Sequence, residues 1–545
     1  MTSIDTTAVN EAAVLDPEHV GDIRGALGTI ARGDVAPRAG LRRKLLTLLA
    51  ILGPGLIVMV GDNDAGAFAT YTQAGQNYGT HLMWTLPLLV PVLYVAQEMV
   101  VRLGAVTGVG HARLILERFG RFWGAFSVID LFILNALTLV TEFIGISLAV
   151  SYLGLPKVPS VLVAGGAVIA AASTGSFRRF ERVCLALVAG SLLLVPIYLM
   201  VHPPAGLVAR SLAVPGLPAH AQLSTVMLLV IGVVGTTIAP WQLFFQQSYI
   251  IDKRITPRFI HYERADLWIG IGLVVVGAAA MFGFADATFA GHPGFGNFTD
   301  AAGVARGLAR YVSPAAGDLF AIALVDAAII GASAVGLATS YALADVMGFD
   351  HSLHRRVTKA KGFYALFAGL MTLAAALVLA PGVPLGLLTE GVQVLAGVLL
   401  PSAIVFLVLL CNDRAVLGPW VNSRRLNVVA SVIVGVLVLL SVVLTVSVLF
   451  PAISGRQIEE ILIGGVVLGA GVGAWLIVQG RRMRERELRL PADWEARDTW
   501  RMPALSRLAR PSMSRTRKVG LIALRSYLAL AFVMVIVKIV TVAIG

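Results

Sequence analysis

Charged residues are scarce in this chain. Only 14% of its 545 residues are Asp, Glu, Lys or Arg, whereas 57% are hydrophobic. Soluble domains carry about 25% charged residues, and a soluble fold of this size cannot bury so much apolar surface. The composition excludes a soluble protein. It predicts an all-α membrane protein, because helices pair their own backbone groups in lipid.

Cysteine is rarer still. The two cysteines, Cys184 and Cys411, lie inside apolar runs, which argues against a disulfide framework, a thiolate zinc site or a redox pair. The first 37 or so residues lack the apolar core of a signal peptide, and their composition predicts a disordered cytosolic tail. The net charge of +12 does not indicate a nucleic-acid partner, because the basic residues sit in short loops between apolar runs.

Long apolar runs make up most of the chain. A run of about 17–25 residues has the length of a membrane-spanning helix. The sequence predicts 13 such segments, at 47–76, 81–103, 123–152, 158–174, 183–201, 224–250, 265–284, 318–346, 362–380, 385–411, 427–450, 458–479 and 519–544.

The loops between these segments alternate in charge. Basic residues cluster in every second loop, as at Arg178–Arg182 and Lys253–Arg264, and the intervening loops carry few. The positive-inside rule then places the N-terminus in the cytosol. We expect a multi-pass protein of the bacterial plasma membrane, with the lipid bilayer as its surroundings.

Two of the apolar segments contain residues that interrupt a helix. Segment 1 has Gly-Asp-Asn-Asp-Ala-Gly at 61–66, and segment 6 has Gly-Thr-Thr-Ile-Ala-Pro-Trp-Gln at 235–242. A carboxylate at mid-membrane costs on the order of 2.5–3.5 kcal/mol, so Asp62 and Asp64 are expected to face a polar cavity or a ligand. Pro240 removes a backbone donor and kinks its helix. The alternative is a simple packing kink at Pro240, with the aspartates near a helix end.

The spacing of the two breaks indicates internal symmetry. Interrupted helices five segments apart are typical of an inverted five-helix repeat, whose breaks meet near the midplane and can hold a cation. Residues 480–518 are rich in arginine, and this basic arm is expected to lie against anionic lipid headgroups. The predicted units are 1–46 (cytosolic tail), 47–201 (first repeat), 224–411 (second repeat), 427–479 (two extra helices), 480–518 (basic cytosolic arm) and 519–545 (last membrane helix).

Other polar groups inside the spans complete the candidate site. Glu142 in segment 3 is the third candidate carboxylate. Gln242 and Gln393 are candidate amide ligands, although a lone intramembrane Gln more often joins two helices. The carbonyls around Thr236 and Thr237, freed by the break, can also contribute oxygen ligands.

These motifs resemble those of the Nramp metal transporters. The likeness runs from about Leu48 to Leu410 and implies the LeuT-type fold, with segments 1–5 and 6–10 as inverted repeats and two or three extra C-terminal helices. The matching motifs are Gly53-Pro54-Gly55, Asp64-Ala65-Gly66-Ala67-Phe68-Ala69-Thr70, Gln73-Ala74-Gly75, Arg102-Leu103-Gly104, Val106-Thr107-Gly108, Ala239-Pro240-Trp241 and Gln393.

The departures from the family pattern concern selectivity. The family's Asp, Asn and Met ligands for manganese or iron become Asp64, Ala67 and Ala239 here. Trp241 replaces the family's histidine, and Leu139 replaces the segment 3 Asp that is linked to proton movement. Losing the thioether removes a preference for soft metals, and two alanines leave room for water. The pattern is most similar to the Nramp-related magnesium transporters.

The resemblance therefore implies facilitated uptake of largely hydrated Mg²⁺, and also of Mn²⁺, with no cofactor and no proton coupling. Asp64 is the expected central ligand, Glu142 and Asp62 add negative charge, and Gln242 and Gln393 orient the hydration shell.

Three alternatives remain open. One is a proton-coupled manganese or iron transporter of the usual family type. Another is an amino-acid permease of the same fold, against which a carboxylate at the segment 1 break argues. A membrane-embedded hydrolase is the third, but the chain has no His-Glu-x-x-His or Gly-x-Ser-x-Gly run and no histidine in the interrupted segments. We therefore do not expect an enzyme.

Overall fold

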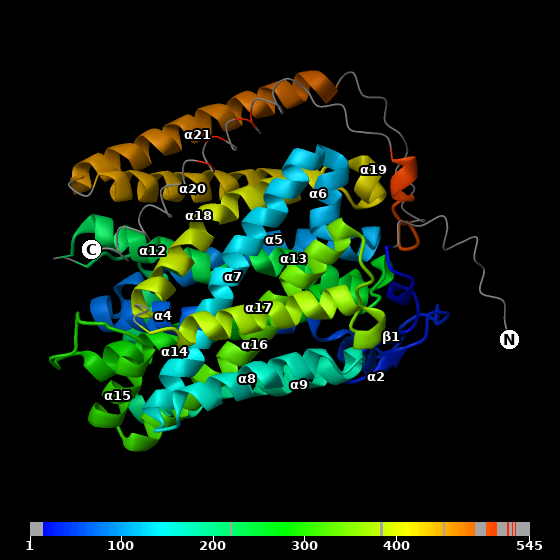
Figure 1. Ribbon diagram of the computed structural model, residues 1–545. Coiled ribbons are helices and arrows are strands. Elements are labelled where there is room, and N and C mark those ends of the chain that lie inside the picture. Colours follow the sequence, from blue (N-terminus) through cyan, green and yellow to red (C-terminus); the bar gives the residue numbers. More distant parts are fainter. Residues whose placement is uncertain are drawn as a thin grey trace.

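The computed structural model of the protein describes residues 15–218, 221–381, 385–450, 453–484 and 497–508, together with residues 520, 522, 526 and 529. This part of the chain is helical apart from one short hairpin and the connecting loops (Figure 1). The elements are β1 (Ile23–Arg24), β2 (Thr29–Ile30), α2 (Leu41–Ile51), α3 (Pro54–Val60), α4 (Ala65–Tyr78), α5 (Thr85–Thr107), α6 (His111–Phe119), α7 (Arg121–Tyr152), α8 (Lys157–Ala172), α9 (Phe177–Gly190), α10 (Leu194–Val201), α11 (Ala205–Ala213), α12 (Leu223–Thr237), α13 (Pro240–Asp252), α14 (Ile260–Phe289), α15 (Ala301–Tyr311), α16 (Pro314–Met347), α17 (Lys361–Leu379), α18 (Leu385–Cys411), α19 (Arg414–Leu417), α20 (Arg424–Leu449) and α21 (Gly455–Arg484).

The predicted spans correspond closely to these helices. In the described part of the chain, nine helices or continuous helix pairs are long and apolar enough to cross a membrane, and the bent pair α2–α3 makes a tenth. The predicted segment at 158–174 is α8, which is apolar but only 16 residues long. The segment at 458–479 lies within α21. The segment predicted at 519–544 falls outside the described residues, apart from four isolated positions.

Four long helices surround the interrupted segments. α16 packs along α7, α14 packs against both α3 and α4, and α18 packs against α12. Figure 1 shows α8 and α9 at one edge of this bundle and α20 and α21 at the opposite edge. The most apolar stretch of α7 is 72% buried, whereas that of α20 is 33% buried. The central helices therefore enclose the two breaks, while the outer helices turn apolar faces outward to lipid.

The N-terminal region is ordered from residue 15 onward, so the expected disorder of the first 37 residues is wrong for the described part. Residues 15–36, here called the N-terminal strap, contain a hairpin in which Ile23 pairs with Ile30, and both side chains are buried. Its backbone is held by distant polar groups: Ala26 N donates to Glu181 Oε2 at 2.5 Å, and Arg254 Nε donates to the Glu18 carbonyl at 2.7 Å. These partners could not be recognised from the local sequence.

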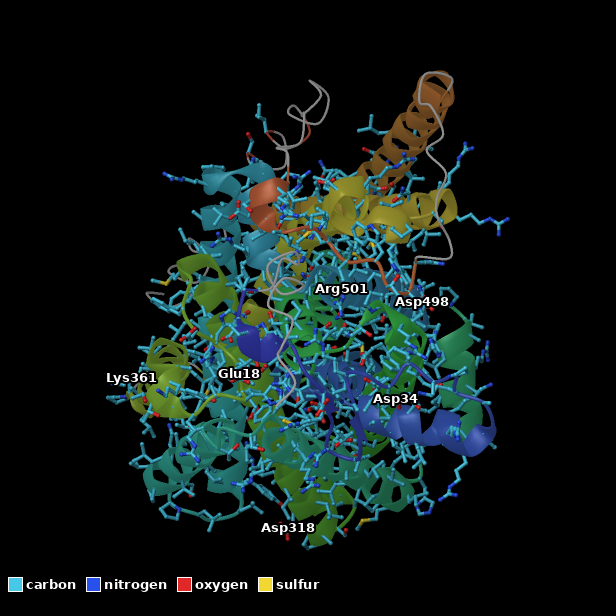
Figure 2. All side chains as sticks on the ribbon, turned by 90° about the vertical axis from the view of Figure 1, so that its right-hand side faces the viewer. Glu18, Asp34, Asp318, Lys361, Asp498 and Arg501 are labelled. Carbon is cyan, nitrogen blue, oxygen red and sulfur yellow. The ribbon has the colours of Figure 1, made fainter. Side chains whose placement is uncertain are left out.

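Residues 497–508 of the basic arm pack on the same end of the molecule as the N-terminal strap. Arg501 donates to the Ala105 carbonyl at 2.7 Å, at the C-terminus of α5, and Met502 N donates to the Val106 carbonyl at 3.2 Å. Figure 2 looks onto this end and shows Asp498 and Arg501 above the strap residues Glu18 and Asp34. Residues 497–508 thus contact protein at this end of the bundle, a contact that the expectation of an arm lying against lipid headgroups did not include.

A buried ion pair near the strap makes stability depend on pH. Burial alone would lower the pKa of His351, but the Asp345 carboxylate, 2.8 Å from Nε2, raises it to about 9. A folded-state pKa above the unfolded value of about 6.5 gives stability that is complete below pH 6.5 and lost as the pH rises through 9, about 3 kcal/mol in all.

We therefore expect the apparent unfolding temperature in detergent to fall between pH 6.5 and pH 9.5, and His351→Gln to remove most of that fall. His292→Gln is the matched control, because His292 is exposed and stacks only on Tyr311. Identical pH profiles for the wild type and His351→Gln would contradict the assignment.

Candidate functional site

Segment 1 is broken where the sequence predicts. α3 ends at Val60, residues 61–64 are not helical, and α4 begins at Ala65. Asp64 is the N-cap residue of α4, and its Oδ1 accepts a hydrogen bond from Ala67 N at 2.9 Å. A carboxylate at this position satisfies a backbone donor that the new helix leaves free. The break thus fixes the Asp64 side chain in the bundle interior, where it is 3% exposed.

Segment 6 is broken two residues before the expected kink. α12 ends at Thr237, Ile238 and Ala239 are extended, and α13 starts with Pro240 in its first turn. Because proline has no N–H, the Thr236 carbonyl loses the donor that a continuous helix would give it. The two predicted breaks are confirmed, and the second leaves a backbone oxygen available at mid-span.

Asp64, Glu142 and Gln393 come together around the first break. Glu142 Oε2 accepts a hydrogen bond from Ala65 N at 3.2 Å, so the two carboxylates lie at the same helix start. Gly331 of α16 lies against both, since a Cβ there would approach Glu142 Cδ to 2.8 Å and Asp64 Cβ to 2.9 Å. The Gln393 amide lies directly against Gly66, on the side that also faces Asp64 Oδ1.

Asp62 and Gln242 form a second polar group beside the first. Gln242 Nε2 donates to Asp62 Oδ1, and Gln242 Oε1 accepts from Gln97 Nε2 at 3.0 Å. Asp62 Oδ2 has no hydrogen-bond partner. Each candidate amide thus lies near a different aspartate. Gln242 donates to Asp62, and Gln393 lies on the side of Gly66 that faces Asp64.

Thr236 and Thr237 line the segment 6 side of this group. The Thr237 hydroxyl lies 2.7 Å from the Tyr71 hydroxyl of α4 and donates to the Val233 carbonyl at 2.6 Å. The Thr236 hydroxyl is buried without a hydrogen-bond partner, as are both polar atoms of the Gln246 amide. The Thr236 hydroxyl oxygen and Gln246 Oε1, together with a freed carbonyl, are oxygen ligands of the kind that hard cations prefer.

The four substituted family positions are all buried around the breaks. Ala67 and Leu139 are completely buried, and Leu139 lies one helical turn before Glu142. Ala239 is one of the two extended residues in the segment 6 break. The Trp241 ring is completely buried, lies near Gly61 at the first break, and its Nε1 has no hydrogen-bond partner.

Three residues at the site were not predicted from the sequence. Gln97 is a lone amide in segment 2, Tyr71 looks like an ordinary aromatic residue of segment 1, and Gly331 is one of many glycines. Gln97 could have been found as an intramembrane polar residue. The other two carry no local signal, because their roles depend on which helices lie opposite them.

Interrupted helices whose breaks meet at buried carboxylates define a multi-pass membrane protein of the LeuT-type transporter fold. The family model described as natural resistance-associated macrophage protein-like matches residues 55–447. The chain belongs to this Nramp family.

Similar proteins agree with this assignment. The divalent metal cation transporter MntH of Deinococcus radiodurans is 28% identical over 436 residues, which cover 78% of this chain and 94% of that protein. MntH of Burkholderia ambifaria is 29% identical over 417 residues, with coverages of 72% and 87%. The Eremococcus coleocola manganese transporter, solved with an aromatic bis-isothiourea substituted compound, has a TM-score of 0.61 at 20% identity, with coverages of 82% and 98%. The last likeness shows the shared fold.

Proposed function

We propose that this protein transports divalent metal ions, and that it carries largely hydrated Mg²⁺ and also Mn²⁺. The observation that carries the proposal is the cluster of Asp64, Glu142 and Gln393 at the first helix break. Two carboxylates and an amide give negative charge and oxygen ligands in the interior of the bundle. The relatives named as divalent metal cation transporters support the class of substrate.

The chemistry of the donors favours a hard, hydrated cation. Ala239 stands where the family has its methionine, so the segment 6 break contributes no thioether ligand for softer metals. Ala67 and Ala239 are also small, which leaves room for water around an ion held by Asp64. Magnesium dehydrates reluctantly and is usually bound through one or two carboxylates with several waters retained. Asp62 and Gln242 then act beside this site, adding charge and orienting water.

We further propose that transport is uncoupled from protons. Leu139 replaces the family's segment 3 aspartate and Trp241 its histidine, so two groups that the family links to proton movement cannot carry a proton here. A negative interior potential alone drives a divalent ion inward by about 2.3 kcal/mol per charge per 100 mV.

Orientation and internal repeats complete this proposal. Arg178, Arg254 and Arg355 all contact the N-terminal strap, so one end of the bundle collects basic residues. The positive-inside rule makes this end cytosolic. Residues 47–201 and 224–411 are proposed as the two inverted repeats, joined through α11.

Uptake into liposomes tests the proposal. At fixed membrane potential, we expect Mg²⁺ and Mn²⁺ to enter without acidifying the lumen, because no proton accompanies the ion. The experiment records metal entry and internal pH together, with protein-free liposomes as the control. Acidification that accompanies Mn²⁺ or Cd²⁺ entry, with no Mg²⁺ entry, would favour the second candidate.

That second candidate is a proton-coupled manganese or iron transporter. Its support is the retained Glu142 and the manganese transporter of the same fold. An amino-acid permease is disfavoured, because the Asp64 carboxylate occupies the helix start where a substrate carboxylate would bind.

A further inference from the structure

A second group of buried charges lies at the base of α3, apart from the proposed transport site. It comprises Glu181 on α9, Lys253 just after α13, and Glu263 and Asp266 on α14, and all four side chains are completely buried. We call these residues the basal cluster. Three carboxylates and one ammonium leave the cluster with an excess of negative charge.

Lys253 connects the basal cluster by hydrogen bonds to the bend between α2 and α3, here called the hinge (residues 51–53). Its Nζ donates to the carbonyls of residues 51 and 52 at 2.6 and 2.9 Å and to Glu181 Oε1 at 2.7 Å. The two helices are bent by 54° at this hinge. The Lys253 charge is therefore already compensated by Glu181 and by two carbonyl oxygens.

Asp266 accepts hydrogen bonds from the backbone on the α3 side of the hinge. Its Oδ2 accepts hydrogen bonds from Gly55 N at 2.7 Å and from Gly53 N at 3.2 Å. α3 then packs closely along α14: a Cβ at Gly55 would approach Leu267 N to 2.7 Å, and a Cβ at Gly270 would approach Met59 Cβ to 2.8 Å. This contact seals the cluster from water while α3 stays in place.

Glu263 is the carboxyl group without compensation. Both of its oxygens lack a hydrogen-bond partner, and so does Asp266 Oδ1. The charged groups that interact with Glu263 are Asp266 on its own helix, Lys253 and Glu181. Among the neighbouring arginines, Arg178 interacts with Glu181, and Arg264 is directed to Glu98 at 2.6 Å. An ionised carboxylate that is buried and unpaired is strongly disfavoured.

We propose that Glu263 and Asp266 together bind one proton, and that this proton leaves when α3 moves away from α14. Once the helices part, water reaches both carboxyl groups and the ionised forms become favourable. The proton enters and leaves on the same side of the membrane, so no net proton transport accompanies the metal. The site would thus regulate opening at this end of the bundle.

The direction of the pH effect follows from linkage. The closed arrangement holds one more proton than the open one, so acid at this side favours closure and alkali favours opening. One proton changes the ratio of open to closed protein by at most about tenfold per pH unit. This regulatory role rests on the proposed transport function, whereas the bound proton itself does not.

Infrared difference spectroscopy tests the bound proton on the whole purified protein. Replacing Glu263 by Gln is expected to remove the band of a protonated carboxylic acid. Glu117→Gln is the matched control: Glu117 is partly exposed and pairs with Arg113 at 2.7 Å, so its loss should remove a carboxylate band instead. Loss of a carboxylate band in Glu263→Gln would overturn the proposal. If that variant does not fold, Asp266→Asn serves for the same measurement, because the proton is shared.

Uptake at varied internal pH, with external pH and potential fixed, tests the regulation. We expect wild-type Mg²⁺ uptake and that of Glu117→Gln to rise with internal pH, and uptake by Glu263→Gln to be nearly constant. An equal slope in all three proteins would overturn the regulatory role. A wild type without any metal uptake would refute the proposed function instead, and the infrared result would still decide whether the proton is bound.

Discussion

Replacing Asp64 by Asn should reduce Mg²⁺ and Mn²⁺ uptake by roughly 100-fold or more, about 2.7 kcal/mol. The amide can still cap α4 through its side-chain oxygen, so the helix start is kept and only the negative charge is lost. Asp64→Ala removes the cap as well, and we expect it to be inactive and also less stable by about 1 kcal/mol. The measurement is initial metal uptake into liposomes containing matched amounts of protein.

Asp326→Asn is the control for this result. Asp326 is another aspartate within a membrane span, but it lies against Gly190 of α9 and, five residues before Gly331, on a different face of α16. We expect near-normal uptake in this variant. Full transport by Asp64→Asn would show that the ion is held elsewhere.

Restoring a methionine at position 239 should change which metals are carried. Ala239→Met places a thioether at the segment 6 break, and sulfur favours later transition metals and cadmium over magnesium. We expect Cd²⁺ uptake to rise about tenfold relative to Mg²⁺ uptake, since the soft ligand adds binding energy for one ion and displaces water from the other. Competition between the two metals in the same liposomes measures this ratio.

The effect of bulk must be separated from the effect of sulfur in that experiment. Ala239→Leu adds a side chain of similar size without a soft donor. It should lower Mg²⁺ uptake by filling space that water needs, without raising Cd²⁺ uptake. Equal Cd²⁺ uptake in the Met and Leu variants would show that position 239 does not contact the ion.

Much of the fold was predictable because its signals are local. An apolar run long enough to span lipid identifies a helix by composition alone, and a proline or an aspartate within such a run marks an interruption. The breaks at residues 61–64 and 238–239 were therefore expected within a few positions. The pairing of Asp62 with Gln242, 180 residues away, depends on the relative placement of segments 1 and 6, which no local pattern encodes.

The N-terminal strap shows the same limit more clearly. Its sequence mixes charges with Ala and Gly and has no long apolar run, so no local pattern predicts an ordered segment. Order comes from partners elsewhere, such as Glu181 for Ala26 and Arg355 for Asp16. A short polar segment becomes ordered when a folded surface supplies complementary charges, and that surface exists only after the bundle has assembled.

The contact between Asp16 and Arg355 also constrains the order of events during biosynthesis. These residues are separated by 339 positions, so Asp16 leaves the ribosome long before its partner is made. At about 5–20 residues per second, the delay is roughly 20–70 s. During this interval the N-terminal strap lacks its contact with Arg355, although its other partners Glu181 and Arg254 are made earlier. The strap can therefore complete its docking only after the loop between α16 and α17 has been synthesised, when about two thirds of the 545 residues have been made.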